Sequence, residues 1–463
     1  MRTPGAILLI SCYELGHQPL NLASPLAVLK QAGFAPVAID TAVEPLMDDS
    51  ITQARLVCVS VPMHTALRLA MRVAERVRTL NPAARLCFYG LYASLNADYL
   101  HQQGIEFVIG GEYEQALLAL VQTLEQGNHA TLPGIGTQSQ PAAPILRRLP
   151  FIQPDRQMLP PLQRYARLQQ GDEFALVGYV ETSRGCLHTC LHCPITPVYG
   201  GRFFILPREV VLQDIRAQVQ MGAQHITFGD PDFLNGPGHS LNILRAMHAE
   251  FPALTFDATI KIEHILEHRE RFTEFKALGC AFIVSAVEAV SDHVLSHLDK
   301  GHTRADVIEA LAILADAGIP MRPSLLPFTP WTTLDDYLNL LAFVEQQHLI
   351  GQIDPVHYSI RLLLPPGSAL LEQPAMRPHL GDLDAAAFTY QWTHPDPRMD
   401  QLQRDIAALV EADERANAPA EETFYAIKAL AEEAAGLVLS AAHSSRPSSI
   451  QKATPHLTES WFC

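Results

Sequence analysis

"SRGCLHTCLHC", residues 183–193, carries the most specific signal in this sequence. It holds Cys186, Cys190 and Cys193 in a C-x-x-x-C-x-x-C pattern, although the whole sequence of 463 residues contains only eight cysteines. An apolar run over 174–182 predicts a strand that leads into the first cysteine. The three thiols are therefore expected on a loop at the carboxyl end of a strand, one ligand short of a closed metal site.

Two metal centres are compatible with three neighbouring cysteines. Zinc would need a fourth ligand, which His188 or His192 could supply in principle, but the spacing is not that of a zinc finger and no second C-x-x-C follows. A [4Fe-4S] cluster held by three cysteines leaves one iron open for a small molecule. The second centre explains why the fourth ligand is missing.

Composition excludes several functional classes. A formal net charge of -16 argues against a nucleic-acid binder, because such a protein needs a basic face. No apolar stretch approaches the length of a membrane span. The opening "MRTPGAILLISCYELGH" is expected to contain a buried strand and not a signal peptide, since Tyr13 and Glu14 stand where small residues would mark cleavage. Eight cysteines in so long a chain form no disulfide framework, so we expect a cytoplasmic protein with reduced thiols.

The first 130 residues alternate between short apolar runs and amphipathic segments, which predicts a doubly wound parallel sheet in a domain over 1–130. Ligands of such sheets bind beyond the carboxyl ends of the strands. The expected strands are 6–12, 35–40, 54–62, 84–90 and 104–112, and the expected helices are 24–34, 66–82 and 113–127. No G-x-G-x-x-G or G-x-x-x-x-G-K-[ST] is present, which argues against a dinucleotide or a P-loop nucleotide.

The rest of the chain divides into a proline-rich linker (131–170), a second α/β domain (171–370), an acidic helical region (371–438) and a flexible tail (439–463). The second domain is expected to be a partial (β/α)6 barrel, with its chemistry on the loops at the carboxyl ends of the strands. The expected strands are 174–182, 225–232, 254–262, 280–289, 320–328 and 354–366, and the expected helices are 207–222, 239–250, 263–278, 303–318 and 333–348.

The cysteine spacing after a strand, followed by this alternation, resembles the radical S-adenosylmethionine superfamily. The resemblance implies that the methionyl group of S-adenosylmethionine chelates the open iron and that one electron from the cluster yields a 5′-deoxyadenosyl radical. It also implies an adenine-packing role for His192 and cofactor-binding roles for polar residues at the strand ends, although each of these could equally be a helix cap or a surface ion pair. These candidates are Gly229, Asp230, Asp232, Lys261, Glu263, Glu288 and Arg322.

The stretch "GIEFVIGGEYEQALLALV" (104–121) resembles the last strand, Gly-Glu turn and last helix of cobalamin-binding domains. The linker likewise resembles the connector of such proteins, with its Pro-Asp-Arg at 154–156. The likeness implies that the corrin or its tail lies near Ser60, Gly90, Gly110, Gly111 and Glu112. The D-x-H-x-x-G motif is absent, so no histidine ligand to cobalt is expected, and the plainer alternative is a flavodoxin-like domain without a ligand.

The whole chain also resembles a family of radical S-adenosylmethionine proteins whose carboxyl terminus reads Cys-Sec-Ala-Glu-Pro or Cys-Cys-Ala-Glu-Pro (the CUAEP/CCAEP tail). Here the chain ends at Cys463, next to Trp461 and Phe462. We hypothesise that a selenocysteine codon follows and is read as a stop. A thiol paired with a selenol would suit a soft acceptor such as trivalent arsenic.

The sequence therefore predicts a radical S-adenosylmethionine enzyme with a [4Fe-4S] cluster, S-adenosylmethionine and cobalamin as cofactors. It would act on a small molecule by methyl transfer or radical rearrangement, with carbon–arsenic bond formation as one possibility, and would need an electron donor such as flavodoxin or ferredoxin. The alternative is a non-catalytic metal- and corrinoid-binding protein.

Overall fold

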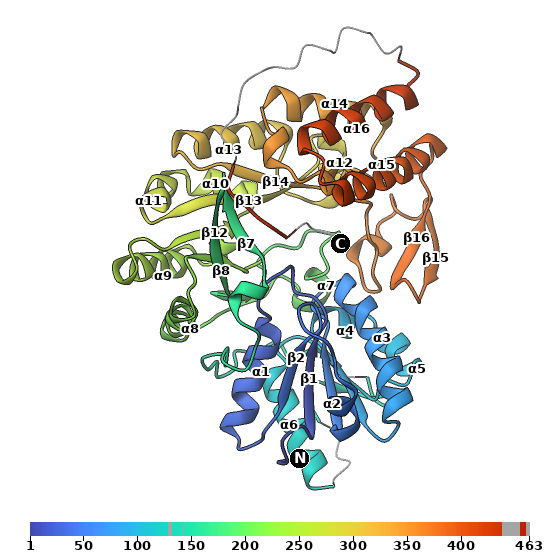
Figure 1. Cartoon of the computed structure of the whole chain (residues 1–463). Coiled ribbons are helices and arrows are strands. Elements are labelled where there is room, and N and C mark those ends of the chain that lie inside the picture. Colours follow the sequence, from blue (N-terminus) through green and yellow to red (C-terminus); the bar gives the residue numbers. More distant parts are fainter. Residues whose placement is uncertain (128–131, 142, 438–453, 460–463) are drawn as a thin grey trace.

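The computed structural model describes residues 1–127, 132–141, 143–437 and 454–459, and arranges them in two α/β units with a helical layer at the carboxyl-terminal end (Figure 1). The amino-terminal unit lies at the bottom of the view and the second unit above it. The two cofactor-binding regions predicted from the sequence thus belong to separate sheets.

The amino-terminal sheet has the order β2-β1-β3-β4-β5-β6, with β1 to β5 parallel and β6 antiparallel to β5. This confirms the predicted doubly wound sheet. The strands are β1 (Ile7–Ser11), β2 (Val37–Asp40), β3 (Leu56–Ser60), β4 (Arg85–Tyr89), β5 (Phe107–Ile109) and β6 (Ile135–Gly136). The helices are α1 (Leu20–Gln31), α2 (Asp48–Gln53), α3 (His64–Leu80), α4 (Leu91–Leu95), α5 (Ala97–Gln102) and α6 (Glu114–Glu125).

Strand β1 shows why this sheet consists of unbroken apolar runs. Ile7 and Leu9 pack on one face, in the core that includes α1 and α6, while Leu8 and Ile10 pack on the other, in the core that includes α3. A parallel sheet covered by helices on both faces has no polar side, so its strands do not alternate in hydropathy.

The second sheet has the order β14-β13-β12-β11-β8-β7-β17, and its first five strands are parallel. It curls into a half-barrel, which confirms the predicted fold class. The strands of the second unit are β7 (Arg167–Gln170), β8 (Glu173–Val180), β9 (Ser183–Gly185), β10 (Phe203–Ile205), β11 (His225–Phe228), β12 (Thr255–Thr259), β13 (Cys280–Glu288) and β14 (Met321–Leu325). Its helices are α7 (Thr196–Tyr199), α8 (Arg208–Gln220), α9 (Pro237–Glu250), α10 (Ile262–Glu267), α11 (Phe272–Ala277), α12 (Asp292–Leu298), α13 (Arg304–Asp316) and α14 (Leu334–Gln346).

The sixth strand expected over 354–366 is reduced to one parallel bridge, between Phe328 and Arg361. Pro355 instead begins a 3₁₀ turn that ends at Tyr358. Proline has no N–H to donate to a neighbouring strand, so this segment cannot extend the ladder.

The helix expected over 263–278 is split into α10 and α11, because the charged stretch 269–271 between them buries no side chain. By contrast, α13 and α14 begin as their sequences direct. Thr303 and Thr333 each form a capping box with an aspartate three residues later.

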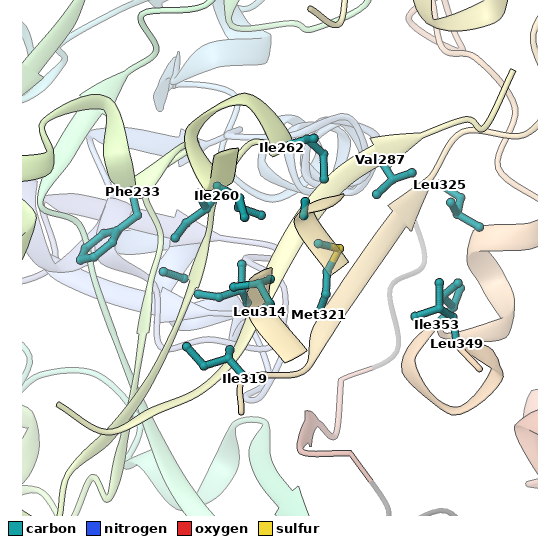
Figure 2. Close-up of a cluster of buried hydrophobic side chains, with 14 of the residues drawn as sticks. Phe233, Ile260, Ile262, Val287, Leu314, Ile319, Met321, Leu325, Leu349 and Ile353 are labelled. Carbon is teal, nitrogen blue, oxygen red and sulfur yellow. The ribbon is translucent and has the colours of Figure 1, made fainter. Parts of the chain in front are cut away.

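The core of the half-barrel lies between its parallel strands and their helices. Figure 2 shows part of it, a buried cluster that includes Ile260, Val287 and Met321 from the strands or their ends and Leu314 of α13. This core also includes residues of the two carboxyl-terminal helices, α15 (Pro397–Ala416) and α16 (Ala420–Ala434), among them Ile406 and Ile427.

Two segments differ from the expected helical region and flexible tail. Before α15, the chain forms an antiparallel pair, β15 (Leu380–Asp384) and β16 (Thr389–Trp392), inside the region predicted to be helical (371–438). Within the expected tail, residues 454–459 contribute β17 (His456–Leu457), which pairs antiparallel with β7. Cys463, at the end of the expected tail, lies outside the described residues.

Candidate active site

The three cysteines lie on the loop that follows β9. Gly185, directly before Cys186, has φ of +77°, and a Cβ there would lie 2.4 Å from the carbonyl oxygen of Arg202. Cys186 and Cys190 are buried and Cys193 is partly exposed, and all three are free thiols. Thr196 Oγ1 donates to the carbonyl of Cys190 at 2.9 Å, which holds the middle of the loop in place.

Burial favours the protonated form of two of the three thiols. Burial raises the pKa of Cys186, and it raises the pKa of Cys193 to about 11. A metal that binds here must displace the protons, as thiolate ligation requires. Lys261 Nζ lies 3.6 Å from Cys190 Sγ and also pairs with Glu263, so a positive charge stands beside the negative ligand set.

Asp230 fixes the chain that leads into the cysteine loop. Its carboxylate accepts hydrogen bonds from the Thr182 amide at 2.9 Å, the Thr182 hydroxyl at 2.7 Å and the Ser183 hydroxyl at 2.6 Å. Burial raises the pKa of Asp230 to about 6, although these donors partly oppose the shift. At Gly229 a Cβ would lie 2.0 Å from the Tyr179 hydroxyl, so only glycine fits there.

Asp232 is fully buried and lies between two histidines. Its Oδ2 is 3.1 Å from His188 Nε2, in the cysteine loop, and 2.7 Å from His264 Nδ1, in α10. Burial would raise the pKa of Asp232, but the two histidines outweigh it and hold the pKa at about 2. Glu263 Oε2 lies 3.7 Å from His188 Nδ1. Two sequence-predicted residues thus meet two histidines that the predicted cofactor site did not include.

Glu288, at the end of β13, adopts a left-handed conformation with φ of +63°. Its Oε1 lies 3.3 Å from both His192 Nε2 and Lys300 Nζ. Burial opposes ionisation of Glu288, yet Lys300 and His192 hold its pKa well below the usual range. Another predicted residue, Arg322, donates to Asp354 at 2.7 Å.

The residues predicted to lie near cobalamin divide into two groups. The Ser60 hydroxyl is buried at the carboxyl end of β3 without a hydrogen-bond partner, and Gly90 begins α4 with φ of +112°. Gly110 and Gly111 are packed against other parts of the chain. A Cβ at Gly110 would lie 2.4 Å from the side chain of Ser94, and a Cβ at Gly111 would lie 2.4 Å from the carbonyl oxygen of Ile145.

Glu112, the fifth predicted residue, is fully buried and contacts the cysteine-bearing unit. Its carboxylate accepts from Arg184 Nη1 at 3.1 Å and from the Tyr199 hydroxyl at 3.1 Å. Arg184 also pairs with Glu114 at 2.7 Å and with Glu181 at 2.9 Å. The last turn of the amino-terminal sheet is therefore joined by buried ion pairs to the residue two positions before Cys186.

Two further histidines of the amino-terminal unit have partners within the chain. His17 is buried, with its ring 4.7 Å from that of Tyr179, and burial lowers its pKa to about 4. His64 Nε2 lies 2.7 Å from the carbonyl oxygen of Ala387.

Sequence reasoning missed His264, Lys300 and Arg184 as members of the site. An H-x-x-x-H spacing at 264–268, directly after a predicted strand, was a usable signal for His264. Nothing local marks Lys300 or Arg184, since each meets its carboxylates only through the tertiary fold.

Residues 180–343 match the family model of the radical SAM superfamily, which confirms the predicted radical SAM domain. The hopanoid C-3 methylase of Methylococcus capsulatus is 25% identical over 324 residues, 68% of this chain and 62% of that protein. An uncharacterized methyltransferase of Pyrococcus horikoshii is 23% identical over 294 residues, 61% of this chain and 62% of that protein. The chain spans less than two thirds of the length of these curated relatives.

Two solved structures share the fold. The radical S-adenosylmethionine methyltransferase TsrM of Kitasatospora setae, with cobalamin and a [4Fe-4S] cluster bound, has a TM-score of 0.60 at 18% identity, covering 75% of this chain and 71% of that one. The cobalamin-dependent radical enzyme OxsB, with aqua-cobalamin and S-adenosylmethionine bound, has a TM-score of 0.71 at 15% identity, covering 92% of this chain and 71% of that one. No helix among the described residues combines the length and apolar character that a membrane crossing requires.

Proposed function

We propose that this chain is a cobalamin-associated radical S-adenosylmethionine enzyme that transfers a methyl group to a small molecule. The observation that carries the proposal is the loop with Cys186, Cys190 and Cys193, free thiols at the carboxyl edge of a parallel half-barrel inside a radical SAM domain. Three soft thiolates suit a [4Fe-4S] cluster and leave one iron for a further ligand.

The bound cluster and S-adenosylmethionine would supply a 5′-deoxyadenosyl radical, and the protein supplies position and charge. Lys261 places a cation beside Cys190, which favours the reduced, more negative cluster. Asp230 anchors the strand end before the loop through three hydrogen bonds. Glu288 holds His192, one position before Cys193, in a fixed orientation. Two of the residues predicted to bind S-adenosylmethionine differ in what they can offer. Gly229 could contribute only backbone atoms, and the guanidinium of Arg322 is already paired with Asp354.

Cobalamin would bind at the carboxyl edge of the amino-terminal sheet. The hydroxyls of Ser11 and Ser60 end two adjacent strands there, and both are buried without hydrogen-bond partners, as expected where a polar ligand completes the site. Gly110 and Gly111 approach the linker instead, so the predicted corrin contacts at these positions would be made through the backbone. Methyl transfer is supported by the named activities of the relatives.

The substrate, the electron donor and the cellular location stay predictions from the sequence. The hypothesis of carbon–arsenic bond formation rests on the thiol of Cys463. The likeness to the CUAEP/CCAEP-tail family also involves Cys463, which lies outside the described residues. A flavodoxin or ferredoxin would supply the electron that the cluster needs.

Anaerobic reconstitution with iron and sulfide tests the proposal. We expect wild-type protein, given S-adenosylmethionine and a strong reductant, to release 5′-deoxyadenosine, and Cys190→Ala to release none. Cys280→Ala is the matched control, because Cys280 is an equally buried thiol on β13 outside the motif. A wild-type protein that carries zinc in place of iron and sulfide and cleaves nothing would favour the non-catalytic alternative.

A further inference from the structure

A cluster of nitrogen and oxygen donors lies beside the cysteine loop. His188 Nε2, Asp232 Oδ2 and His264 Nδ1 all lie within 4.8 Å of one another. They come from three separate segments: the loop after β9, the turn after β11 and the first turn of α10. Asp232 and His264 are buried, with 0% and 7% of their surface exposed.

Asp232 and His264 form a close ion-pair contact whose direction is poor for a hydrogen bond. His264 Nδ1 lies 2.7 Å from Asp232 Oδ2, yet this buried nitrogen has no partner with hydrogen-bond geometry. Two potential ligand atoms that approach one another off the hydrogen-bond direction are expected where both are directed at a common third atom. A buried polar atom left without a partner is also costly, which a bound ion would remedy.

A carboxylate also lies near the second ring nitrogen of His188, at a distance longer than a hydrogen bond. Its Nε2 faces Asp232, while its Nδ1 lies 3.7 Å from Glu263 Oε2. Histidines that bind metals commonly donate their other ring N–H to a carboxylate, which fixes the tautomer and the ring orientation. Glu263 is itself paired with Lys261, which holds this carboxylate in place.

We propose that His188, Asp232 and His264 bind one divalent transition-metal ion, separate from the iron–sulfur cluster, with Glu263 orienting His188. Two imidazoles and one carboxylate suit Zn²⁺ or Fe²⁺, whereas the neighbouring thiolates suit a cluster. With three protein ligands, the ion keeps at least one position for an oxygen or nitrogen donor of a substrate. Asp232 and Glu263 then serve this ion and not S-adenosylmethionine.

The geometry requires only a small adjustment. In a tetrahedral site with bonds of about 2.1 Å, ligand atoms stand roughly 3.4 Å apart. Asp232 Oδ2 already lies at or inside that separation from both histidines. The two imidazole rings are also neighbours, with centroids 4.8 Å apart.

Zinc uptake by the protein with its reconstituted cluster tests the proposal. After anaerobic incubation with Zn²⁺ and desalting, we expect one zinc per chain in the wild type, with iron and sulfide contents unchanged. His264→Gln and Asp232→Asn should lose this zinc while keeping full iron; the asparagine oxygen can still accept from the Leu234 amide, as Asp232 does at 3.2 Å. His268→Gln, one turn further along, is the matched control and should keep the zinc.

Zinc X-ray absorption separates this site from the cysteines. We expect nitrogen and oxygen neighbours at about 2.0–2.2 Å and no sulfur at about 2.3 Å. The proposal is overturned if the wild type takes up no zinc beyond the His264→Gln level, if zinc enters only as iron leaves, or if sulfur appears in the zinc shell. None of these outcomes depends on S-adenosylmethionine cleavage, so failure here is distinguishable from failure of the proposed function.

Discussion

Arg156 joins the linker to both α/β units and gives a quantitative test of how the units are held together. The Arg156 guanidinium is 2% exposed and forms two parallel bonds with Asp214 of α8, Nε to Oδ1 at 3.0 Å and Nη2 to Oδ2 at 2.8 Å. It also donates to the carbonyl oxygens of Gln18 at 3.1 Å and Tyr179 at 2.7 Å. Gln18 belongs to the amino-terminal unit and Tyr179 to the half-barrel.

Arg156→Met should destabilise the protein strongly. The substitution keeps an apolar stem of similar length but leaves the buried Asp214 carboxylate without a counterion. Removing one member of a buried ion pair costs about 3–5 kcal/mol. The Gln18 carbonyl oxygen also loses the Arg156 donor, whereas that of Tyr179 keeps the side-chain amide of Gln218 at 3.1 Å. The double substitution Arg156→Met with Asp214→Leu should recover part of this loss, because neither charge then remains buried alone.

Urea unfolding followed by tryptophan fluorescence measures the effect as a lower midpoint. Arg245→Met is the matched control, since Arg245 forms a similar two-bond pair with Glu274 but is mostly exposed to water. Its midpoint should stay close to that of the wild type. An Arg156→Met midpoint equal to that of Arg245→Met, or a double variant less stable than either single one, would refute the reasoning.

Three further predictions concern the cluster side of the half-barrel. Gly229→Ala should sharply reduce the yield of folded protein because its Cβ would overlap the Tyr179 ring, and Tyr179→Ala in the same chain should restore part of that yield; the absence of any restoration would contradict the assignment. Burial raises the pKa of Asp230 to about 6, so the stability that its protonated form contributes is present below about pH 4 and is lost as the pH rises to about 6. The urea midpoint of Asp230→Asn should therefore fall less than that of the wild type over this range, and parallel curves would rule the effect out. Lys261→Met removes a cation 3.6 Å from Cys190 Sγ and should make the cluster harder to reduce; a potentiometric titration with an unchanged or higher potential would disprove this.

Local features of the sequence predicted the elements that depend on nearest neighbours in the chain. Apolar runs such as 6–12 and 54–62 became buried parallel strands, since a strand covered on both faces must be apolar throughout. The cysteine spacing located the loop, and alternating strand and helix signals indicated the half-barrel. Two predictions were wrong where proline or a charged run interrupts the pattern. The strand expected over 354–366 is mostly absent because Pro355 begins a 3₁₀ turn, and the helix expected over 263–278 is divided at 269–271.

Charge pairing across the fold was not predictable in the same way. Asp232 and Glu288 were identified as polar residues at strand ends, but their partners lie far away in sequence or in another element. A lone buried charge is too costly to keep, so each needed a partner, yet no local pattern shows which side chain supplies it. The strand formed by 456–457 was missed for a related reason, because its pairing with β7 spans most of the chain.

Spacing and hydropathy along the chain were enough to place three thiols on one loop at the end of a strand and to indicate two successive parallel sheets, because these signals act over a few residues. Which charged groups meet depended on packing in three dimensions: Arg184 with Glu112 and Glu114 of the amino-terminal unit, Lys261 with Cys190, and Asp232 with two histidines. These pairs form because the packing of strands and helices brings the charged side chains together. Once they are buried, each charge needs its partner, since an unpaired buried charge is costly.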